Sequence, residues 1–312
     1  KNRKIKTFYI GDGAARTKFF LTLKTKILIM DMPDLNSFHI KRSKIYPVHY
    51  VYIFHSMFSM HSYLRKGAID NYDTIFCVGE HHVNEIKETE RIYNLKPKKL
   101  IKYGFGRLDT LLDEKKQHTY DLTSNNLVLI APSYGDKNLL EMCGIELIDN
   151  LLKSHFKVLL RPHFRTLKNS KKLLDLIKIK FGDNPNFIFE NGIIPPDVFH
   201  RSLCMISDWS GISLEYAFTF VRPIIFIDVP KKNLNPNVKD ISSEPIEKSI
   251  RNKIGYVFSP TNLEDIPNII KNLNKTKSFN KQIQETRSKT VYNIGKSAKV
   301  GAEYIYALNN SL

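Results

Sequence analysis

The sequence predicts an α/β protein whose two halves each contain a parallel β-sheet. Apolar runs of four to six residues alternate with segments of helical spacing, an order typical of strand–helix–strand units. These runs end in polar or charged residues, as buried parallel strands do when their carboxyl ends carry a site. A polar stretch at residues 113–126 separates the halves and is the expected linker, which places a cleft between them.

The first half begins almost directly at a predicted strand. Its strands are expected at residues 7–13, 26–31, 49–56, 74–79 and 98–104, and its helices at 14–23 and 82–93. Gly11-Asp12-Gly13 resembles half of a dinucleotide-binding fingerprint. Because the third glycine of that fingerprint is missing, a tight strand-to-helix turn is the better interpretation.

The second half restarts with a strand at residues 127–131. Further strands are expected in the runs KVLLRPH, NFIFE, CMISD and RPIIFIDVP and at 255–259, helices at 138–155, 167–181, 212–220 and within 263–309, and loops at 191–196 and 231–247. These elements predict domains at 1–118 and 119–290, with a C-terminal helix over 291–312 that packs back on the first domain.

The composition is that of a folded protein of 312 residues, with 42% hydrophobic and 11% aromatic residues. No apolar run approaches the roughly 20 residues of a membrane-spanning helix. The first residues are basic and then strand-like, so we expect no signal peptide, and a longer native chain is compatible with this start. Cys77, Cys143 and Cys204 lie in apolar runs without metal-ligand spacing, which predicts reduced thiols and a cytoplasmic protein.

The chain carries 48 Lys and Arg against 31 Asp and Glu, a net charge of +17. Such an excess fits nucleic acid, an anionic membrane surface or a phosphate-rich substrate. Nucleic acid is the least supported of these partners, because the sequence has no zinc-finger spacing, RNP-like aromatic motif or basic low-complexity tail. The abundance of Lys and Asn also indicates an AT-rich genome, which accounts for part of the excess.

The segment SDWSG (207–211) follows a predicted strand and opens directly into a helical segment. Small residues at a helix start leave backbone N–H groups directed outward, where they suit phosphate. We therefore predict Ser210, Gly211 and Ser213 as phosphate contacts through their N–H groups and hydroxyls.

Histidines and arginines follow two of the predicted strands. His163 ends the run KVLLRPH, with Arg161 two residues before it and Arg165 two residues after it. A histidine in such a place can donate to a phosphate oxygen or serve as an acid or base near neutral pH. His55 ends the third strand of the first half in the same manner. We expect the two imidazoles to meet across the cleft, one acting as general base and the other stabilising the phosphate.

Other polar residues near these strand ends have two interpretations each. Asp208 either caps the following helix or takes part in catalysis. Glu215 either reaches a ribose hydroxyl or lies on a solvated helix face. We expect the remaining histidines of the first half to be surface loop residues, namely His61, His81 and His82. No carboxylate or cysteine joins them at ligand spacing, so no metal site is predicted.

The segments RPH, SDWSGISLEYA and RPIIF resemble the CDP-glycerol glycerophosphotransferase family, the polyol-phosphate transferases of teichoic-acid and capsule synthesis. Residues 161–163 match the R-x-H strand end of that family, and residues 207–217 match its S-D-[YW]-S-S-x-x-x-[DE]-[YF]-A segment, with Gly211 in place of the second serine. The His-Gly-Thr of the family corresponds to His55-Ser56-Met57, where only the histidine is kept. Residues 131–134 are similar to its A-P-T-[WY] strand end. The resemblance runs from about His55 to about Pro230.

This resemblance implies a GT-B-like architecture of two Rossmann-type domains facing a central cleft, followed by C-terminal helices. The first domain holds the acceptor and the second the nucleotide donor, a CDP-alditol. An acceptor hydroxyl attacks the β-phosphorus and CMP leaves, with His55 as base and His163 as electrostatic or acid partner. The implied phosphate contacts are Arg161, Arg165, Ser210, Gly211 and Ser213, and the implied nucleotide contacts are Ser133, Tyr134, Asp208 and Glu215. No metal, and no cofactor beyond the donor substrate, is implied.

The resemblance also implies an acceptor hydroxyl on a lipid-linked saccharide or a cell-surface polymer. The protein is then peripheral on the inner face of the cell membrane, where part of its positive charge contacts anionic headgroups. Two other functions stay open. One is a GT-B glycosyltransferase that uses a nucleotide sugar in cell-envelope polysaccharide synthesis, because such enzymes share the donor domain. The other is a non-catalytic basic homologue that binds membranes or polymers.

Overall fold

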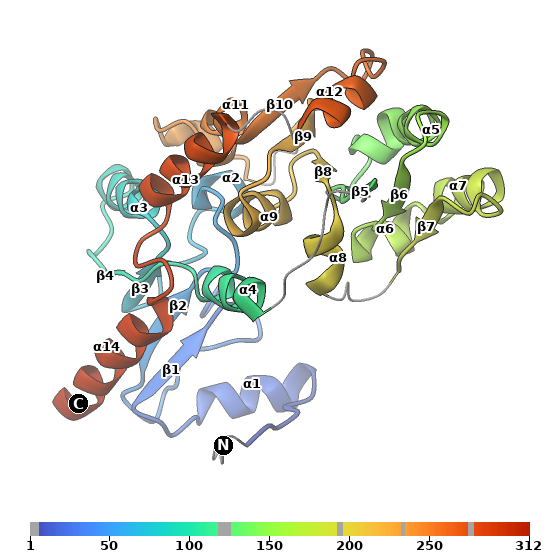
Figure 1. The fold of residues 1–312 in the computed structure, drawn as a ribbon. Coiled ribbons are helices and arrows are strands. Elements are labelled where there is room, and N and C mark those ends of the chain that lie inside the picture. The colour runs from blue at the N-terminus through green and yellow to red at the C-terminus, as the bar shows by residue number, and fades with distance from the viewer. Residues whose placement is uncertain (1–5, 118–125, 192–195, 232–234, 274–277) are drawn as a thin grey trace.

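A computed structural model describes residues 6–117, 126–191, 196–231, 235–273 and 278–312. Within these ranges the strands form two sheets in which all neighbouring strands are parallel (Figure 1). The first sheet has the order β1-β2-β3-β4, and the second has the order β10-β9-β8-β5-β6-β7. The predicted α/β class with two parallel-sheet halves is confirmed.

The elements of the first half are, in chain order, α1 (Gly13–Leu21), β1 (Ile27–Met30), β2 (His49–Ile53), α2 (Met60–Tyr63), β3 (Thr74–Cys77), α3 (Glu80–Ile92), β4 (Lys99–Lys102) and α4 (Gly106–Gln117). Those of the second half are β5 (Leu127–Ile130), α5 (Leu139–Lys153), β6 (Lys157–Leu160), α6 (Phe164–Asn169), α7 (Lys171–Phe181), β7 (Phe187–Phe189), α8 (Pro196–Arg201), β8 (Cys204–Ser207), α9 (Ile212–Phe220), β9 (Ile224–Ile227), the 3₁₀ turn η1 (Val238–Asp240), α10 (Ile246–Ser249), α11 (Arg251–Ile254), β10 (Gly255–Phe258), α12 (Ile266–Asn272), α13 (Ser278–Thr290) and α14 (Ser297–Ser311).

Two predictions for the first half are wrong. Residues 7–13 pair with no strand of the first sheet, and the side chains of Phe8 and Tyr9 are 80% and 89% exposed. Conversely, α4 covers residues 106–112, for which no element was predicted, and the start of the predicted linker. Leu108, Leu111 and Leu112 give α4 a short apolar face, which is buried because the helix packs against α9. The rest of the predicted linker, 118–125, lies outside the described residues.

The second half differs from the prediction mainly in its short helices. The predicted helix at 167–181 is divided, because α6 ends at Asn169 and α7 begins at Lys171. Helix α8 occupies part of the segment after β7, α10 begins within the predicted loop at 231–247, and α11 follows that loop. The polar residues of these short helices carry too little periodicity to reveal them.

Both faces of the second sheet are buried, because its strands alternate between two cores. In β5, Leu127 and Leu129 point to the core shared with the first half, whereas Val128 and Ile130 pack with α5 and α7 on the opposite face. The shared core continues from the first sheet into the second, so the halves are joined by apolar packing as well as by the chain.

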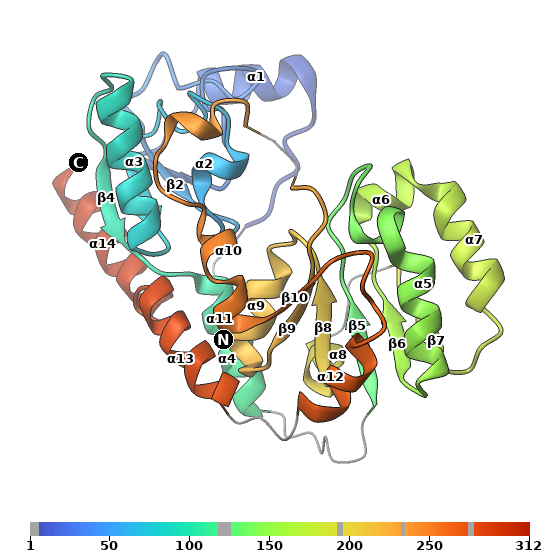
Figure 2. The same ribbon diagram turned by 90° about the horizontal axis from the view of Figure 1, so that it is seen from above.

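The chain ends by returning to the first sheet (Figure 2). Helix α13 packs against α9 and α11, and α14 places Tyr304 and Ile305 against Val51 and Phe76. The hydroxyl of Tyr304 lies 2.9 Å from Oγ1 of Thr74 in β3. The limits proposed from sequence for the domains, 1–118, 119–290 and 291–312, stay a prediction.

Candidate active site

A cleft of about 440 Å³ lies between the two halves, at the carboxyl ends of their strands. In the second sheet β5 and β8 are neighbours, and the chain leaves them in opposite directions. Open α/β sheets bind ligands at such switch points, because the loops after the two strands separate there. The loops after β2, β6 and β8 and the first turn of α9 all reach this cleft, through His55, Arg161, His163, Ser210, Gly211 and Glu215.

The amino end of α9 faces the cleft. Ser210, Gly211 and Ile212 line it, and their backbone N–H groups form no hydrogen bond with any of the described residues. The next N–H groups, of Ser213 and Leu214, already donate to the carbonyls of Ser210 and Gly211 at 3.1 and 3.2 Å. The cleft therefore offers unpaired donors at the positive end of a helix, an arrangement that binds phosphate.

The opposite end of α9 is held by cations from two other helices. Lys115 of α4 donates to the carbonyl of Thr219 at 3.0 Å, and Arg287 of α13 donates to the carbonyl of Phe218 at 2.7 Å. The last turn of α9 contains no basic residue of its own. Because helix carboxyl ends carry partial negative charge, these two cations stabilise the helix at that end.

Strand β6 delivers Arg161 and His163 to the same cleft. The guanidinium of Arg161 forms no ion pair with the described residues, and its burial, together with nearby Arg107, lowers its pKa. His163 is the N-cap of α6, and its Nδ1 accepts a hydrogen bond from the N–H of Arg165 at 3.2 Å. In the neutral ring the proton is then on Nε2, so His163 can donate a hydrogen bond from that nitrogen.

Aromatic rings fix the orientation of His163. Its ring centroid lies 4.7 Å from that of Tyr134 and 4.4 Å from that of Phe164. The Arg165 guanidinium stacks on Tyr134, with 4.7 Å between its central carbon and the ring centroid. Arg165 was predicted as a phosphate contact, but its exposed side chain does not line the cleft. In this arrangement Arg165 supports the rings of Tyr134 and Phe164, which do line the cleft.

Glu215 brings a carboxylate into a cleft that is otherwise rich in donors. Its Oε2 lies 2.5 Å from Nε of Arg107, which belongs to the first turn of α4. Burial raises the pKa of Glu215, and Arg107 and Arg161 oppose that shift. The solvated-face interpretation of Glu215 is wrong, because the residue is buried. Sequence reasoning missed Arg107, although its place soon after the end of β4 was a usable signal.

Asp208 lies behind the cleft and holds two of its loops together. The buried carboxylate accepts hydrogen bonds from the N–H groups of Ser133 at 2.7 Å, Leu139 at 3.0 Å and Trp209 at 2.7 Å. It does not cap α9, whose N-cap is Gly211. The capping interpretation is therefore wrong. Asp208 instead joins the loop after β5 to the loop after β8.

Two further predicted contacts are also turned away from the cleft. Ser133 does not line it, and its N–H group is occupied by Asp208. Ser213 is buried, and its hydroxyl donates to the carbonyl of Ser210 at 2.7 Å. Both residues hold the backbone that carries the free N–H groups.

On the first sheet, imidazoles hold the loop that carries His55. Nε2 of His81 lies 3.0 Å from the carbonyl of Met57, and Nε2 of His82 lies 2.8 Å from the carbonyl of Phe58. Nδ1 of His82 accepts from the N–H of Val78 at 3.3 Å, which assigns the proton of this ring to Nε2. Burial lowers the pKa of His82 to about 3, so this imidazole is neutral at pH 7.

Carboxylates complete the support of this loop. Glu85 accepts the N–H of Met60 at 2.7 Å, and its Oε2 lies 3.2 Å from Nδ1 of buried His61. From the second half, Glu247 accepts the N–H of Ser59 at 3.0 Å. The prediction that His61, His81 and His82 are surface loop residues is wrong, since His61 and His82 are buried and His81 and His82 lie in the first turn of α3.

The two halves touch within the cleft at Ser56 and Gly211. A Cβ atom built on Gly211 would lie 3.2 Å from Oγ of Ser56, closer than side chains normally pack. These are two positions at which the sequence departs from the family pattern, which has glycine after the histidine and a second serine before the helix.

A family model described as CDP-Glycerol:Poly(glycerophosphate) glycerophosphotransferase matches residues 19–291. The chain belongs to this family. Membership confirms the family resemblance and the enzyme class that the sequence predicts. The family also gives this glycerophosphotransferase a CDP-glycerol-type donor and a polymeric acceptor. None of the proteins with curated functions is significantly similar to it in sequence.

Solved structures confirm the GT-B-like fold of this glycerophosphotransferase. The wall teichoic acid polymerase TagF with CDPG has a TM-score of 0.57 at 16% identity, over 92% of this chain and 73% of that one. MnaA of S. aureus with UDP has a TM-score of 0.57 at 12% identity, covering 94% and 77%. A UDP-GlcNAc 2-epimerase from Methanocaldococcus jannaschii has 0.55 at 13%, covering 96% and 83%. At such identities the likeness concerns the fold alone.

No helix among the described residues is long and apolar enough to cross a membrane. In the same ranges of the chain, no group of three or more His, Cys, Asp or Glu side chains has the arrangement of a metal site.

Proposed function

We propose that the cleft moves a glycerol-phosphate or other polyol-phosphate unit from its CDP-activated donor to a hydroxyl of a teichoic-acid-type polymer or a lipid-linked saccharide, with release of CMP. One observation carries this proposal: His55 of the first half and the phosphate-binding groups of the second half line one cleft. The family supplies the class of donor. The acceptor enters from the first half and the donor from the second.

The donor pyrophosphate is held by groups that match its charge. The free N–H groups at the start of α9 and the guanidinium of Arg161 surround its oxygens, and Nε2–H of His163 donates to them. Groups fixed where negative charge develops stabilise the transition state more than the ground state, and this is usually the largest catalytic contribution. Tyr134 and Glu215 contact the nucleoside, with Glu215 accepting from a ribose hydroxyl.

The reacting step moves one proton and exchanges one P–O bond. His55 removes the proton of the acceptor hydroxyl while the acceptor oxygen bonds to the β-phosphorus of the donor. The bond from this phosphorus to the bridging oxygen breaks, and CMP leaves with the electron pair. His55 suits this task because its side chain is exposed in the cleft, on the acceptor half.

Four predicted contacts act as positioning residues in this proposal: Ser133, Arg165, Asp208 and Ser213. Their hydrogen bonds and ring contacts hold the cleft loops. We also propose that the enzyme works at the inner face of the cell membrane, where its net charge of +17 attracts anionic lipids toward a lipid-linked acceptor.

The donor decides between this function and its alternatives. Incubation with CDP-glycerol, CDP-ribitol and UDP-N-acetylglucosamine, each with an acceptor, should release CMP from a CDP-alditol and no UDP. Release of UDP alone would favour the glycosyltransferase. If no nucleotide is released and none raises the thermal unfolding temperature, the binding-protein alternative is favoured. His39→Ala, at an exposed histidine of the first half, is the control for His55→Ala in the same assay.

A further inference from the structure

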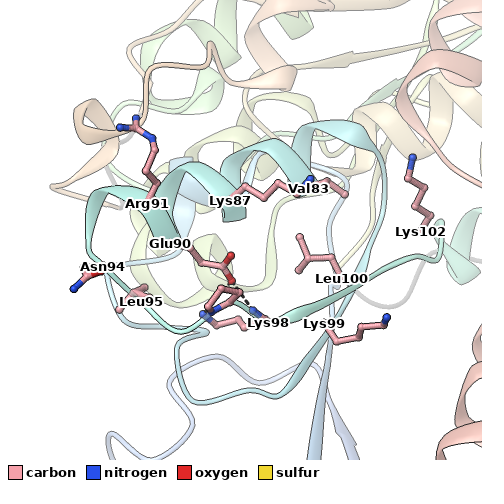
Figure 3. A pocket seen from close by; sticks show the side chains of 11 residues that line it. Val83, Lys87, Glu90, Arg91, Asn94, Leu95, Lys98, Lys99, Leu100 and Lys102 are labelled. Carbon is pink, nitrogen blue, oxygen red and sulfur yellow. Dashed lines mark hydrogen bonds and ion pairs between the residues drawn. The ribbon is translucent and has the colours of Figure 1, made fainter.

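A second concave surface lies on the first half, away from the cleft. It encloses about 910 Å³ between α3 and β4, the edge strand of the first sheet (Figure 3). Val83 and Leu100 contribute apolar side chains to it. Four exposed cations border it, Lys87 and Arg91 on α3 and Lys99 and Lys102 on β4. We call this surface the α3–β4 groove.

The carboxylate of this groove is already neutralised. Oε1 of Glu90 accepts the backbone N–H of Lys98 at 2.8 Å and lies 3.6 Å from its Nζ. Figure 3 shows Glu90 directed toward Lys98. Both side chains are at most 10% exposed, so this pair is screened from any ligand. Its charges cancel, which leaves the four exposed cations to set the potential of the groove.

These cations have few partners of their own. Lys87, Arg91 and Lys99 form no ion pair with the described residues. Lys102 lies 3.5 Å from Glu80, but both side chains are more than half exposed, and such pairs contribute little. An incoming anion therefore has no internal carboxylate to displace at three of the four positions.

Protection of a free sheet edge explains only part of this pattern. Lysines on an edge strand discourage pairing with another sheet, and β4 pairs with β3 alone. That role fits Lys99 and Lys102. It does not account for Lys87 and Arg91, which are four residues apart on α3 and so lie on one helix face beside the same groove.

We propose that the α3–β4 groove binds the phosphodiester backbone of the acceptor polymer, outside the reacting cleft. This inference rests on the proposed function. The cations are spread along two rims instead of converging on one point, and Lys87 and Arg91 are about 6 Å apart along the helix axis. A linear polyanion with regularly spaced phosphates fits such a pattern better than a single phosphate does. A flat bilayer cannot enter a concave surface.

The position of the groove suits a chain whose end must reach His55. All strands of the first sheet are parallel, so Lys102, at the carboxyl end of β4, lies at the same sheet edge as the loop after β2. A polymer held there keeps its growing end near the cleft between additions. Holding one part of a ligand raises the effective concentration of the other part.

Binding tests the groove without any need for turnover. Lys87→Glu/Arg91→Glu should bind lipid-free poly(glycerol phosphate) at least about tenfold more weakly than the unchanged protein, with a shallower dependence on salt. The matched control is Lys171→Glu/Lys172→Glu, which makes the same charge change at exposed positions of α7. Equal polymer affinity in the groove variant and the unchanged protein would overturn the proposal. So would a loss confined to phosphatidylglycerol vesicles, which would assign the groove to the membrane.

Product length provides a second measurement. The groove variant should transfer the first unit to a short acceptor at the normal rate but make shorter polymers, whereas the control makes polymers of normal length. Normal product length would contradict the proposed use of the groove. If the unchanged protein transfers nothing from either CDP-glycerol or CDP-ribitol, the proposed function fails, and the binding assay still decides whether the groove holds a polyanion.

Discussion

Imidazoles together with carboxylates hold the cleft loop of the first half, whereas the carboxylate of Asp208 holds the cleft loops of the second half. In the first half, Nε2 atoms of His81 and His82 bond to backbone carbonyls in the loop that carries His55. In the second half, the carboxylate of Asp208 accepts from three backbone N–H groups. Irregular backbone under a site must satisfy its polar groups without a strand or helix partner. The comparison shows that imidazoles, which donate to backbone carbonyls, and carboxylates, which accept from backbone N–H groups, can both supply the missing hydrogen-bond partners.

The two solutions differ in their response to pH. A neutral imidazole that is buried resists protonation until the protein unfolds, so it makes stability depend on pH near 6. Burial raises the pKa of the Asp208 carboxyl although its N–H donors oppose that shift, so protonation of this group at low pH does not destabilise the folded protein. We therefore expect acid to destabilise the first half, which is proposed to hold the acceptor, more than the second half. We also expect the second half, which is proposed to hold the donor, to contribute most of the electrostatic stabilisation of the reaction.

The largest expected effect distinguishes the two imidazoles that we propose take part in the reaction. His55→Ala and His163→Ala should each reduce turnover by about 10²- to 10⁴-fold, the usual contribution of a positioned acid or base. Only His163→Ala should also weaken binding of CDP-glycerol, because only this ring is proposed to contact the donor phosphate. Calorimetric titration with donor, with thermal unfolding as the check of the fold, measures the difference. Near-normal turnover of either variant would remove that residue from the mechanism.

The next effect concerns the support of the donor half. Asp208→Ala leaves three N–H groups without their acceptor, and each loss costs about 1–3 kcal/mol, so the free energy of unfolding should fall by about 3 kcal/mol or more. Asp208→Asn should cost less, since its side-chain oxygen can replace Oδ1, which accepts two of these bonds. Urea unfolding measures both. An alanine variant as stable as the unchanged protein would show that the loops do not depend on this carboxylate.

Acid should destabilise the support of the acceptor half. His82 has a pKa of about 3 when folded and about 6.5 when unfolded. Stability from this residue is complete above pH 6.5 and is lost as the pH falls toward 3, by about 1.4 kcal/mol per pH unit. His82→Leu should reduce the slope of unfolding free energy between pH 6.5 and 5 by that amount, whatever its stability at pH 7. His39→Leu, at an exposed site, should keep the slope. An unchanged slope in His82→Leu would disprove the assignment.

The smallest expected effect lies where the halves touch. Gly211→Ser places a side chain against Ser56, and overpacking of this size costs about 1 kcal/mol, or roughly fivefold in kcat/KM. Adding Ser56→Gly should restore most of the loss, because it removes the hydroxyl that is crowded. Steady-state kinetics of the two single variants and the double variant form a complete cycle. If the double variant is no better than Gly211→Ser, the two positions do not compensate each other.

Local patterns predicted most strand ends of the cleft correctly. The run KVLL, followed directly by Arg161 and His163, showed both a buried strand and the polar groups at its end. The segment after β8 likewise showed a helix start with small residues. These signals are contained in ten or fewer neighbouring residues, so a single sequence is enough to read them.

Features that depend on distant residues could not be predicted. The pair of Arg107 and Glu215 joins positions 108 residues apart. The burial of His61 and His82 depends on how the loop after β2 packs beneath α3, which no periodicity records. Helix α4 has only a narrow apolar face, and its partner α9 lies in the other half. Phe8 and Tyr9 show the opposite kind of error: their segment has a strand-like pattern, but it pairs with no strand of the first sheet and both side chains are exposed.

The orientation of helix α9, and with it the direction of its dipole, is fixed by the surrounding structure. Lys115 and Arg287 fasten its distal carbonyls to two helices that belong to different parts of the chain, and nearly all its side chains are immersed in the core. Water around a free phosphate must reorient as charge migrates during reaction. In the proposed complex with the donor, folding has already aligned these amides, so such a reorientation adds nothing to the barrier in each catalytic cycle.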